Sequence, residues 1–395
     1  MTTRILFLSF FYPPDLSAGS FRSAALVKAL RLQGGEQLYL DVLTTQPNRY
    51  QTFVRDADSS EEHEGLHIRR VTLPGIGSGL LAQAWSFLHF ALGAYRFTSD
   101  KHYDVVFATS SRLMTAVLGA LLAVSKGAQL YLDIRDIFVE TISGVFGSPL
   151  FRPVVWAFGL LERSTIRRAT VVNLVSPGFQ PYFQSRYPNR RFSFFSNGVD
   201  IEFTDPVACN QAIRAEGEPL RVLYAGNIGD GQGLHLVVPA LAGRLKGRVT
   251  FQVIGDGRLA GALREVIDLQ QLDNVELLAP MSRQKIKVFY EQADVLFLHL
   301  NDLKAFKRVL PSKLFEYAAT GKPIWAGVAG YAAEFIAAEL TNTAVFAPCD
   351  AEAALESFER LELGLTDRAA FVQRYARERI MDEMAQDILQ LLEPA

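Results

Sequence analysis

The stretch that decides the fold is LRVLYAGNIGDGQGLHLVVPALAGRL, residues 220–245. It begins with an apolar run of strand length, continues through a glycine-rich turn, and ends in apolar residues at helical spacing. This order of strand, turn and helix is the repeating unit of an α/β domain. Further strand-like runs follow at residues 249–257, 275–280, 294–300, 323–328 and 343–348. Such alternation is typical of a parallel sheet covered by helices on both faces.

The first half of the chain shows the same alternation, from ILFLSFF at residues 5–11 to FSFFSNGVD at residues 192–200. The turn-rich tetrapeptide NGVD at its end separates the two halves. We therefore predict two Rossmann-like, doubly wound α/β domains that face a central cleft, because ligands of open α/β sheets bind at the carboxyl ends of the strands. The predicted boundaries are 1–198 for the N-terminal domain, 199–368 for the C-terminal domain and 369–395 for a final helix.

Composition restricts the class of protein. Apolar residues make up 49% of the chain and charged residues 21%, as in ordinary globular proteins. The two cysteines have no CxxC or Cys/His spacing, which argues against a disulfide framework and favours a reducing, cytosolic location. The first apolar run is too short for a signal peptide, and no run reaches the roughly 18–20 apolar residues of a membrane span.

The charge is unevenly distributed. Residues 1–200 contain 20 Lys and Arg and 15 Asp and Glu, whereas residues 201–395 contain 20 and 27. The positive half also contains an apolar segment at 79–97 and arginine groups within 163–168 and 186–191. An apolar helix beside basic groups indicates a protein that lies on an anionic membrane. The alternative is a core helix beside solvated arginines.

Several common catalytic motifs are absent. The segment after the first strand, FFYPPDLSAGSFR at residues 10–22, lacks the GxGxxG pattern of dinucleotide-binding enzymes. The sequence also lacks the P-loop pattern GxxxxGK[ST] and the nucleophile elbow GxSxG. These absences count against a dehydrogenase, a P-loop ATPase and an α/β-hydrolase.

Two glycine-rich turns follow strands of the second domain, YAGNIGDGQG at residues 224–233 and VIGDGR at residues 253–258. Glycines at strand ends allow backbone N–H groups to approach an anion, and the next helix N-terminus adds positive potential. The alternative is an ordinary strand-to-helix turn. The candidates for binding a ligand phosphate are Gly226, Gly255, Asp256 and Gly257.

The stretch VLPSKLFEYAATGKPIWA at residues 309–326 predicts a short helix that Pro311 and Ser312 begin and Gly321 ends. A single acid, Glu316, lies in its middle among apolar residues. It is either a solvated side chain or a carboxylate that faces a ligand.

AGNIGDGQGL, VIGDG and PSKLFEYAATGKPI, in this order and separation, resemble the C-terminal domain of glycosyltransferase family 4. FFYPPDLSAGSFR, DIRDIFVETI at residues 133–142 and NLVSPGF at residues 173–179 resemble its N-terminal domain. The resemblance covers nearly the whole chain and is closest to the bacterial subgroup that builds O-antigen and capsule, which includes N-acetylfucosamine transferases. It implies the GT-B fold, in which a C-terminal helix crosses back to the N-terminal domain.

The resemblance also implies an activity. It predicts retaining transfer of a sugar from a nucleotide sugar, UDP-linked by family habit although GDP and TDP stay open, without a metal or other cofactor. The implied acceptor is a lipid-linked glycan at the inner face of the cell membrane, and no nucleic acid is expected as a partner. By motif position Glu316 would accept hydrogen bonds from the donor ribose, since a carboxylate offers acceptors to both hydroxyls.

The sequence departs from the family pattern at three positions. Arg308 stands where a second glutamate is common, and Asn227 and Gln232 stand where an Arg and a Lys neutralise the donor diphosphate. We expect nearby cations and the backbone N–H groups at 311–313 to take over that role, the alternative being a basic loop that faces water. The cations are Lys304, Lys307, Arg308 and Lys313.

The first domain offers a loop after its first strand and charged residues after the strand near 129–134. The loop would bring backbone close to the donor, and Arg22 in the next helix indicates a nearby anion. The charged residues at 133–136 would position the acceptor hydroxyl. The predicted loop residues are Ser17, Ala18 and Gly19, and the predicted catalytic residues are Arg22, Arg135 and Asp136.

Other functions stay compatible with these motifs. A UDP-sugar 2-epimerase on the same fold would release its product without an acceptor. A non-catalytic partner subunit would explain the replaced residues, although the retained Glu316 argues against it. Glycosylation of a soluble small molecule would need a polar acceptor cleft. The order of the motifs favours transfer to a lipid-linked glycan.

Overall fold

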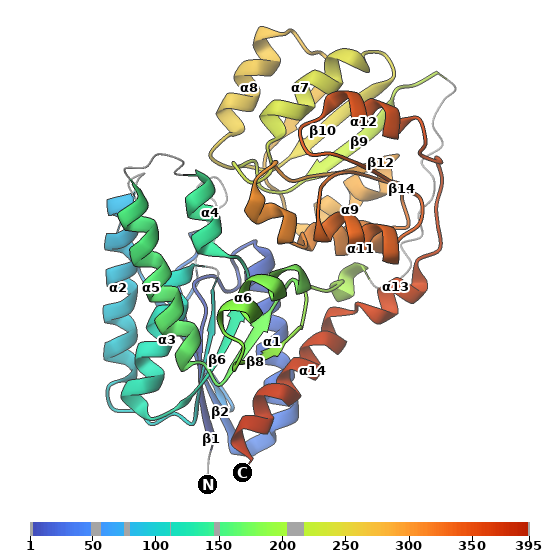
Figure 1. The fold of residues 1–395 in the computed structure, drawn as a ribbon. Coiled ribbons are helices and arrows are strands. Elements are labelled where there is room, and N and C mark those ends of the chain that lie inside the picture. The colour runs from blue at the N-terminus through green and yellow to red at the C-terminus, as the bar shows by residue number, and fades with distance from the viewer. Residues whose placement is uncertain are drawn as a thin grey trace. The chain divides into compact units, whose positions relative to one another are not determined.

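The computed structural model describes residues 3–48, 57–74, 80–110, 112–145, 151–203 and 217–393. The chain divides into two compact units (Figure 1). Unit 1 comprises Met1–Asn197 and Arg377–Ala395, and unit 2 comprises Gly198–Ala376. The last long helix of the chain therefore belongs to the N-terminal unit. The boundary that we placed after residue 368 lies earlier than the observed one, because the short helix Ala369–Arg374 packs on unit 2.

Over its described residues, unit 1 contains an eight-stranded sheet in the order β3-β4-β2-β1-β5-β6-β7-β8. All neighbours are parallel except β3 and β4, which form an antiparallel hairpin at one edge. The strands are β1 (Thr3–Leu8), β2 (Leu38–Thr45), β3 (Ser60–His63), β4 (Leu66–Val71), β5 (Val105–Thr109), β6 (Gln129–Ile134), β7 (Val171–Leu174) and β8 (Arg191–Ser193).

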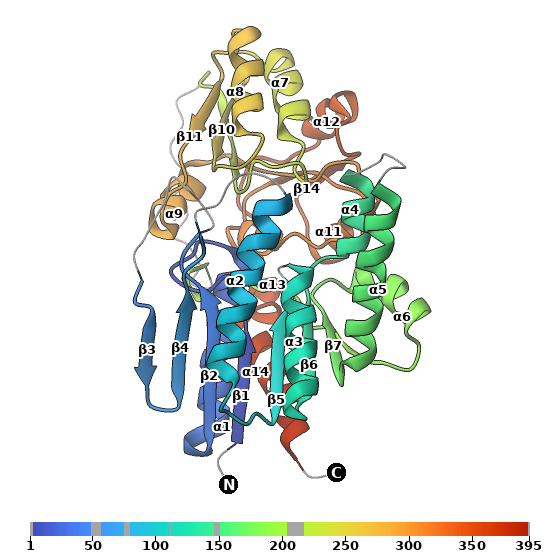
Figure 2. The same ribbon diagram turned by 90° about the vertical axis from the view of Figure 1, so that its left-hand side faces the viewer.

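Helices cover both faces of this sheet. Helices α2 (Leu80–Thr98), α3 (Leu113–Lys126) and α5 (Arg152–Arg168) lie side by side on one face, which Figure 2 turns toward the viewer. On the other face α1 (Ala18–Gly34) packs against the returning helix α14 (Arg377–Leu389). The unit also contains α4 (Phe138–Val145) and α6 (Gln180–Arg186).

Over its described residues, unit 2 contains a six-stranded parallel sheet in the order β11-β10-β9-β12-β13-β14. The strands are β9 (Leu220–Ala225), β10 (Val249–Ile254), β11 (Val275–Leu278), β12 (Val295–His299), β13 (Ile324–Gly327) and β14 (Thr343–Phe346). The helices are α7 (Leu234–Arg244), α8 (Ala260–Leu269), α9 (Arg283–Gln292), α10 (Ser312–Ala319), α11 (Tyr331–Glu339), α12 (Ala351–Phe358) and α13 (Ala369–Arg374). Both units therefore have the Rossmann-like α/β architecture that the strand–helix alternation predicts.

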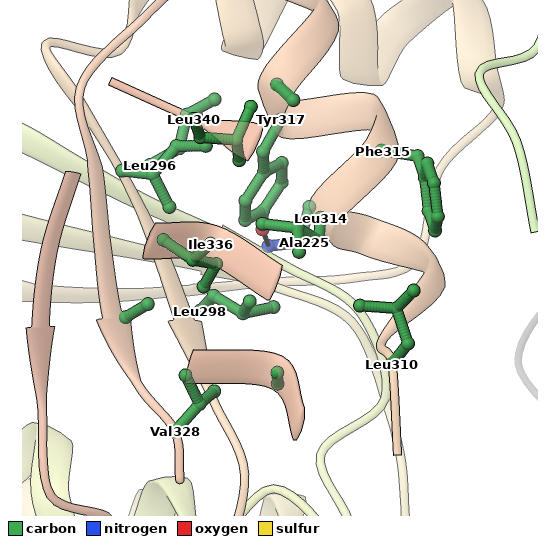
Figure 3. Packing of buried hydrophobic residues seen from close by; sticks show 14 of the residues in the cluster. Ala225, Leu296, Leu298, Leu310, Leu314, Phe315, Tyr317, Val328, Ile336 and Leu340 are labelled. Carbon is green, nitrogen blue, oxygen red and sulfur yellow. Dashed lines mark hydrogen bonds between the residues drawn. The ribbon is translucent and has the colours of Figure 1, made fainter. Parts of the chain in front are cut away.

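The core of unit 2 fixes the position of α10. Leu314 and Tyr317 lie one turn apart on this helix and pack toward Leu298 of β12 and Ile336 of α11 (Figure 3). All four are buried, and burial of one such side chain contributes about 1.5–3 kcal/mol. The Tyr317 hydroxyl also accepts a hydrogen bond from the backbone N–H of Ala225 at 3.0 Å. The helix is therefore held rigidly on the sheet.

The hairpin of β3 and β4 was not expected from the sequence. Strand β3 is mostly exposed and polar, so it lacks the apolar run that marks a strand. The hairpin contains HEGLH at residues 63–67, which matches the HExxH pattern of metalloproteases. That chemistry needs both histidines on one helix face, and here they lie on two antiparallel strands.

Within the described residues, no helix combines the length and the apolar character needed to cross a bilayer.

Candidate functional site

The switch point of the unit 2 sheet lies between β9 and β12, where the strand order reverses. The turn 226–233 follows β9, and a 3₁₀ helix, η5 (Lys304–Arg308), follows β12. Asn301 joins these segments, since its backbone N–H donates to Gly231 O and its side chain donates to Asp230 O, both at 2.9 Å. Ligands of open α/β sheets bind at such a point. Most of the predicted donor-binding residues lie on these segments or on the neighbouring β10–α8 turn.

The three predicted glycines of these turns, Gly226, Gly255 and Gly257, donate their N–H groups to acceptors inside unit 2. Their N–H groups are therefore not open to a phosphate, contrary to our expectation. The acceptors are Ile254 O for Gly226 at 2.9 Å, Leu278 O for Gly255 at 3.0 Å and the Asp256 carboxylate for Gly257 at 2.7 Å.

Close packing of the two turns explains why glycine stands there. A Cβ on Gly255 would lie 1.8 Å from Gly226 O, and a Cβ on Gly257 would lie 2.5 Å from Ile228 O. The backbone of one turn thus rests directly on the backbone of the other, which a side chain would prevent.

Asn227 and Gln232, which stand at the family's Arg and Lys positions, brace the first turn. The Asn227 side chain donates to Gln232 Oε1 at 2.8 Å. The backbone carbonyl of Gln232 accepts from His299 Nδ1 at 2.6 Å, and His299 Nε2 accepts from the N–H of Cys349 at 3.0 Å. Burial lowers the pKa of His299 to about 4, so the imidazole is a neutral, satisfied core group.

The amino end of α10 offers hydrogen-bond donors. Ser312 and Lys313 are its first two residues, and their backbone N–H groups donate to no acceptor within the described ranges. Our expectation of a donor at Pro311 is wrong, because proline has no N–H. Of the cations on the preceding η5, Lys307 pairs with Asp302 at 3.2 Å, while Arg308 is the last residue of that helix.

Glu316 lies next to this helix end and is surrounded by donors. Its side chain is 11% exposed. Oε2 accepts from Lys313 Nζ at 2.8 Å and from the Tyr290 hydroxyl at 3.0 Å, and Oε1 lies 3.3 Å from Arg283 Nη2. Arg283 also pairs with Asp200. Arg283 and Lys313 stand at the starts of α9 and α10, which begin at the carboxyl edge of the sheet because each follows a parallel strand.

The surroundings keep Glu316 ionised. Burial would raise its pKa, but the charges of Lys313 and Arg283 outweigh burial and lower the pKa to about 2. Burial and the Glu316 charge raise the pKa of Tyr290, so its hydroxyl keeps its proton and donates. Sequence analysis missed Arg283 and Tyr290, since they precede Glu316 by 33 and 26 residues and belong to no motif.

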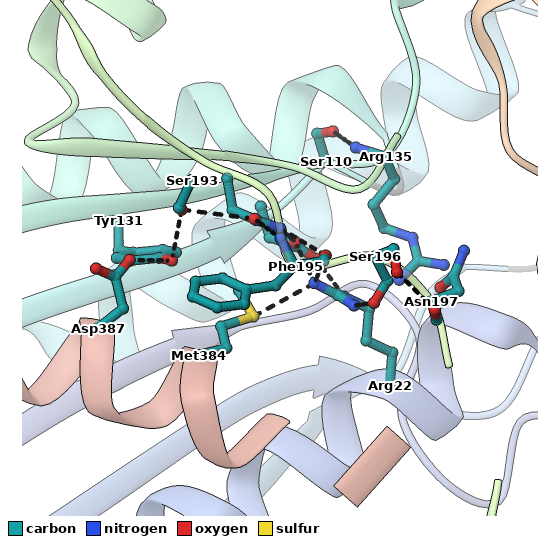
Figure 4. Close-up of polar contacts among 12 residues, drawn as sticks. Arg22, Ser110, Tyr131, Arg135, Ser193, Phe195, Ser196, Asn197, Met384 and Asp387 are labelled. Carbon is teal, nitrogen blue, oxygen red and sulfur yellow. Dashed lines mark hydrogen bonds and ion pairs between the residues drawn. The ribbon is translucent and has the colours of Figure 1, made fainter. Parts of the chain in front are cut away.

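In unit 1 the anion expected beside Arg22 is the internal carboxylate of Asp133. Arg22 is 1% exposed and forms two hydrogen bonds to Asp133, at 3.0 and 3.1 Å. Its other N–H groups donate to the carbonyls of Phe195 at 2.8 Å and Ser196 at 2.6 Å (Figure 4). Burial raises the pKa of Asp133, but the charges of Arg22 and Arg135 lower it overall. Each of the three nitrogens of Arg22 thus has an acceptor inside unit 1.

Arg135 differs from Arg22 in its partners. Its backbone N–H donates to Ser110 Oγ at 3.0 Å (Figure 4). In the part of unit 1 that the structure describes, its Nη1 donates to no acceptor, and Asp133 is already bonded to Arg22. Burial lowers the pKa of Arg135 to about 10, so the side chain remains a cation at neutral pH.

Asp136 lines a small cavity between β6 and the helices α3, α4 and α5. Its carboxylate accepts from Thr141 Oγ1 at 3.1 Å, and burial raises its pKa to about 6. Glu162 and Thr165 also line the cavity. Asp136 therefore changes its charge close to neutral pH.

The loop before α1 serves first as a helix cap. The Ser17 hydroxyl accepts from the N–H of Ser20 at 3.2 Å, and Ala18 and Gly19 form the first turn of α1. N–H groups of a first turn have no partner within the helix, and α1 begins at the carboxyl edge because it follows β1. Across the described ranges, no group of three or more His, Cys, Asp or Glu side chains is placed to hold a metal ion.

Two known families cover most of the chain. Residues 20–198 match the family described as glycosyl transferase 4-like domain, and residues 210–379 match the family described as glycosyl transferases group 1. WcaI of Escherichia coli (strain K12), which is named for a proposed role as a colanic acid biosynthesis glycosyl transferase, is 27% identical over 212 residues. The match covers 51% of each protein, so the chain spans about half the length of this curated relative.

Solved structures share the architecture. Sucrose-phosphate synthase from Thermosynechococcus elongatus superposes with a TM-score of 0.76 at 15% identity, over 99% of both chains. HepE from Anabaena, in complex with UDP, superposes with a TM-score of 0.61 at 18% identity, over 98% of this chain and 100% of HepE. The chain therefore has the GT-B fold and consists of a glycosyl transferase 4-like domain followed by a glycosyl transferases group 1 domain.

Proposed function

We propose that the protein is a retaining, nucleotide-sugar-dependent glycosyltransferase of surface polysaccharide assembly, such as O-antigen or capsule. It moves a sugar from a UDP-sugar to a glycan on polyprenyl diphosphate, without a metal, at the inner face of the cell membrane. N-acetylfucosamine is the first sugar to test. The two domain families, the role named for WcaI and the UDP bound to HepE support this proposal.

The observation that carries the proposal is the ionised carboxylate of Glu316 beside the open end of α10. A carboxylate has about four lone-pair positions, and three are used by Lys313, Tyr290 and Arg283. In the proposed donor complex a ribose hydroxyl replaces Lys313 on Oε2, and the second hydroxyl takes the open position on Oε1.

The ammonium group of Lys313, once displaced from Glu316, then contacts the donor diphosphate. Lys313 is only partly buried, with 26% of its side chain exposed, so its long side chain is able to move. The N–H groups of Ser312 and Lys313 and the positive end of the α10 dipole add to this anion site. These groups replace the Arg and Lys of the family pattern, whose positions Asn227 and Gln232 occupy.

In the proposed reaction the C1–O bond between the sugar and the diphosphate breaks. The acceptor oxygen forms the new bond to C1 on the same face, and the departing diphosphate takes the acceptor proton. Negative charge develops on the diphosphate, so preorganised donors that face it lower the barrier. In unit 1, Arg135 offers N–H donors to an anionic group of the acceptor, and Asp136 accepts a hydrogen bond from an acceptor hydroxyl.

Calorimetry with UDP, GDP and TDP tests the donor site. We compare the wild type with Glu316→Gln, with chelator present, and use the exposed Glu265→Gln on α8 as the matched control. The wild type and the control should bind UDP, and Glu316→Gln should bind it on the order of 100-fold more weakly, because two charge-assisted hydrogen bonds are lost.

The outcomes separate the possible functions. Absence of nucleotide binding by the wild type would contradict the transferase and favour a non-catalytic subunit. Equal binding by both proteins would remove Glu316 from the nucleotide site. Where UDP binds, incubation with UDP-sugars distinguishes transfer to the lipid-linked acceptor from release of a free, epimerised UDP-sugar.

A further inference from the structure

Three neighbouring helices of unit 1 expose large apolar side chains. α3 contacts both α2 and α5, and the three helices cover one face of the sheet (Figure 2). On α2 the exposed residues are spaced by three or four, which aligns them on one side of the helix. We call the following exposed residues the three-helix face: Trp85, Leu88, Leu92 and Tyr95 on α2, Leu121 and Val124 on α3, and Val154, Trp156 and Leu160 on α5.

This concentration is unlike the rest of the described surface. Trp85 is 55% exposed and Trp156 is 68% exposed, although tryptophan is one of the most costly side chains to leave in water. In unit 2 the exposed large apolar residues are all aliphatic, and apart from Leu363 and Leu365, which share a loop, they lie on separate elements, such as Leu236 on α7 and Leu269 on α8. Single exposed residues need no explanation, whereas a group on adjacent helices marks an interaction site.

The charge of the same helices is almost entirely positive. Asp and Glu make up 42 of the 395 residues, yet the three helices contain one acid, Glu162. It is buried and accepts hydrogen bonds from the hydroxyls of Tyr182 and Tyr187. The basic residues of the three helices are Arg96, Lys126, Arg152, Arg163, Arg167 and Arg168.

The basic and apolar groups have a common arrangement. All three helices end in basic residues, namely Arg96, Lys126 and the pair Arg167 and Arg168. On α5 an exposed line runs from Trp156 through Leu160 and Arg163 to Arg167, at spacings of three and four. Aromatic and aliphatic groups next to a basic rim are the composition of helices that lie in a membrane interface.

We propose that the three-helix face docks on an anionic lipid bilayer, with α2, α3 and α5 lying along the membrane surface. A second copy of the chain is the less suitable occupant, because a two-fold contact joins two faces of the same positive charge, and the one acid of the three helices, Glu162, is buried. Anionic headgroups neutralise the same charges. The inference deepens the proposed function, since it names the surface that brings unit 1 to a lipid-linked acceptor.

The tryptophans provide a direct test. The chain contains three: Trp85 and Trp156 belong to the three-helix face, while Trp325 of unit 2 is 0% exposed. We expect vesicles of phosphatidylglycerol and phosphatidylcholine to shift the emission to the blue and brominated lipids to quench it, whereas pure phosphatidylcholine has a much smaller effect. Trp85→Phe and Trp156→Phe should each remove part of the response, and the double variant should leave only the unresponsive Trp325.

Charge variants test the electrostatic part. Arg163→Gln and Arg167→Gln should each lower partitioning into anionic vesicles by about fivefold, whereas the exposed Arg264→Gln on α8 should leave it unchanged. Leu92→Ser should weaken partitioning more than Leu269→Ser. All substituted side chains are exposed, so the variants should fold.

Two results would overturn the inference. One is equal partitioning of the wild type into anionic and neutral vesicles with no tryptophan quenching. The other is a blue shift that grows with protein concentration in the absence of lipid, which would identify a second copy as the occupant. Vesicle binding is measured without nucleotide, and UDP binding is measured without lipid. A negative result for the membrane face therefore leaves the proposed glycosyltransferase function untouched, and the reverse also holds.

Discussion

Glu316 and Asp133 are buried carboxylates that nearby cations keep ionised, but their partners differ. Asp133 is held by Arg22, whose other donors are bonded to backbone carbonyls. Glu316 pairs with Lys313, whose long and flexible side chain is partly exposed. A fixed pair of the first kind orders the fold, whereas a pair with an exchangeable partner is suited to a ligand.

The proposed replacement of Lys313 on Glu316 by a ribose hydroxyl is tested by comparing the binding of UDP with that of uridine. Lys313→Met should weaken UDP binding by about tenfold, because a charge-assisted contact to the diphosphate is lost. Uridine binding should stay equal or become tighter, since a competitor for Glu316 is removed. Calorimetry measures both, with the exposed Lys285→Met on α9 as control. Equal losses for UDP and uridine would contradict the exchange.

Asp136 is predicted to destabilise unit 1 when it ionises. Its pKa rises from an ordinary 3.8 to about 6 on folding, so between these values the folded chain binds more protons and stability falls as pH rises. Asp136→Asn should therefore be more stable than the wild type at pH 7, by up to about 3 kcal/mol.

Urea unfolding of both proteins from pH 4 to pH 7 checks this expectation. The difference between them should grow with pH, while the exposed Asp268→Asn on α8 should show no such trend. A less stable Asp136→Asn protein at pH 7 would contradict it. A destabilising carboxylate is more often kept for function than for folding, so the same variant should lose transferase activity.

Among the secondary structure elements, the two glycine-rich turns of unit 2 act as one packed unit. Gly255 tolerates no Cβ, since the carbonyl of Gly226 would lie 1.8 Å away. Gly261, six residues later in α8, has open space around it, because a Cβ added there would meet nothing within 4 Å. The two glycines therefore differ in tertiary environment although both follow the same strand.

Alanine substitutions should separate these glycines. Gly255→Ala should destabilise the protein by at least about 3 kcal/mol, because backbone must move against backbone. Gly261→Ala should be neutral or stabilising by up to about 1 kcal/mol, since alanine has the higher helix propensity. Chemical denaturation measures both. A mild effect of Gly255→Ala would show that the turns separate easily, and the packing explanation would fail.

At the scale of the whole molecule, unit 1 is assembled from two distant parts of the chain. α14 packs on α1 and buries Met381, Met384 and Ile388. Asp387 of the same helix accepts from the Tyr131 hydroxyl at 2.8 Å (Figure 4). The last helix of unit 1 therefore follows the whole of unit 2 in the sequence.

This connectivity predicts which unit a mutation in α14 affects. Met384→Ala should lower the stability of unit 1 by about 2–5 kcal/mol, as for other buried large-to-small substitutions. The transition of unit 2 should be unchanged in scanning calorimetry. Leu269→Ala on the exposed side of α8 is the control and should change neither transition. A loss confined to unit 2 would contradict the assignment of α14.

Much of the fold follows from local sequence. Apolar runs of strand length separated by helical periodicity mark the parallel strands of both units, since a strand covered on both faces must be apolar throughout. The helix at 312–319 was recognisable from Pro311 and the apolar residues around Glu316. The edge strand β3 was not, because its side chains face water and carry no burial signal.

The candidate site was less predictable. The family resemblance predicted Glu316 and Lys313 as site residues. Arg283 and Tyr290 were not predicted, because they belong to another helix, α9, and contact Glu316 only in the folded unit. The position of Arg22 predicted a nearby anion, and in the structure this anion is Asp133, which is 111 residues away in sequence. Contacts of this kind depend on strand order, which no local pattern encodes.

The sequence by itself determined the two α/β domains, the position of Glu316 on its helix, and the positive, apolar character of the N-terminal half. The tertiary structure decided which N–H groups and cations are already bonded, and it gives internal acceptors to Gly226, Gly255, Gly257 and Arg22. It also gathered the exposed side chains of α2, α3 and α5 on one face. The physical reason is that periodicity reports which side of an element is buried, whereas hydrogen-bond partners and neighbouring faces depend on the order in which elements pack.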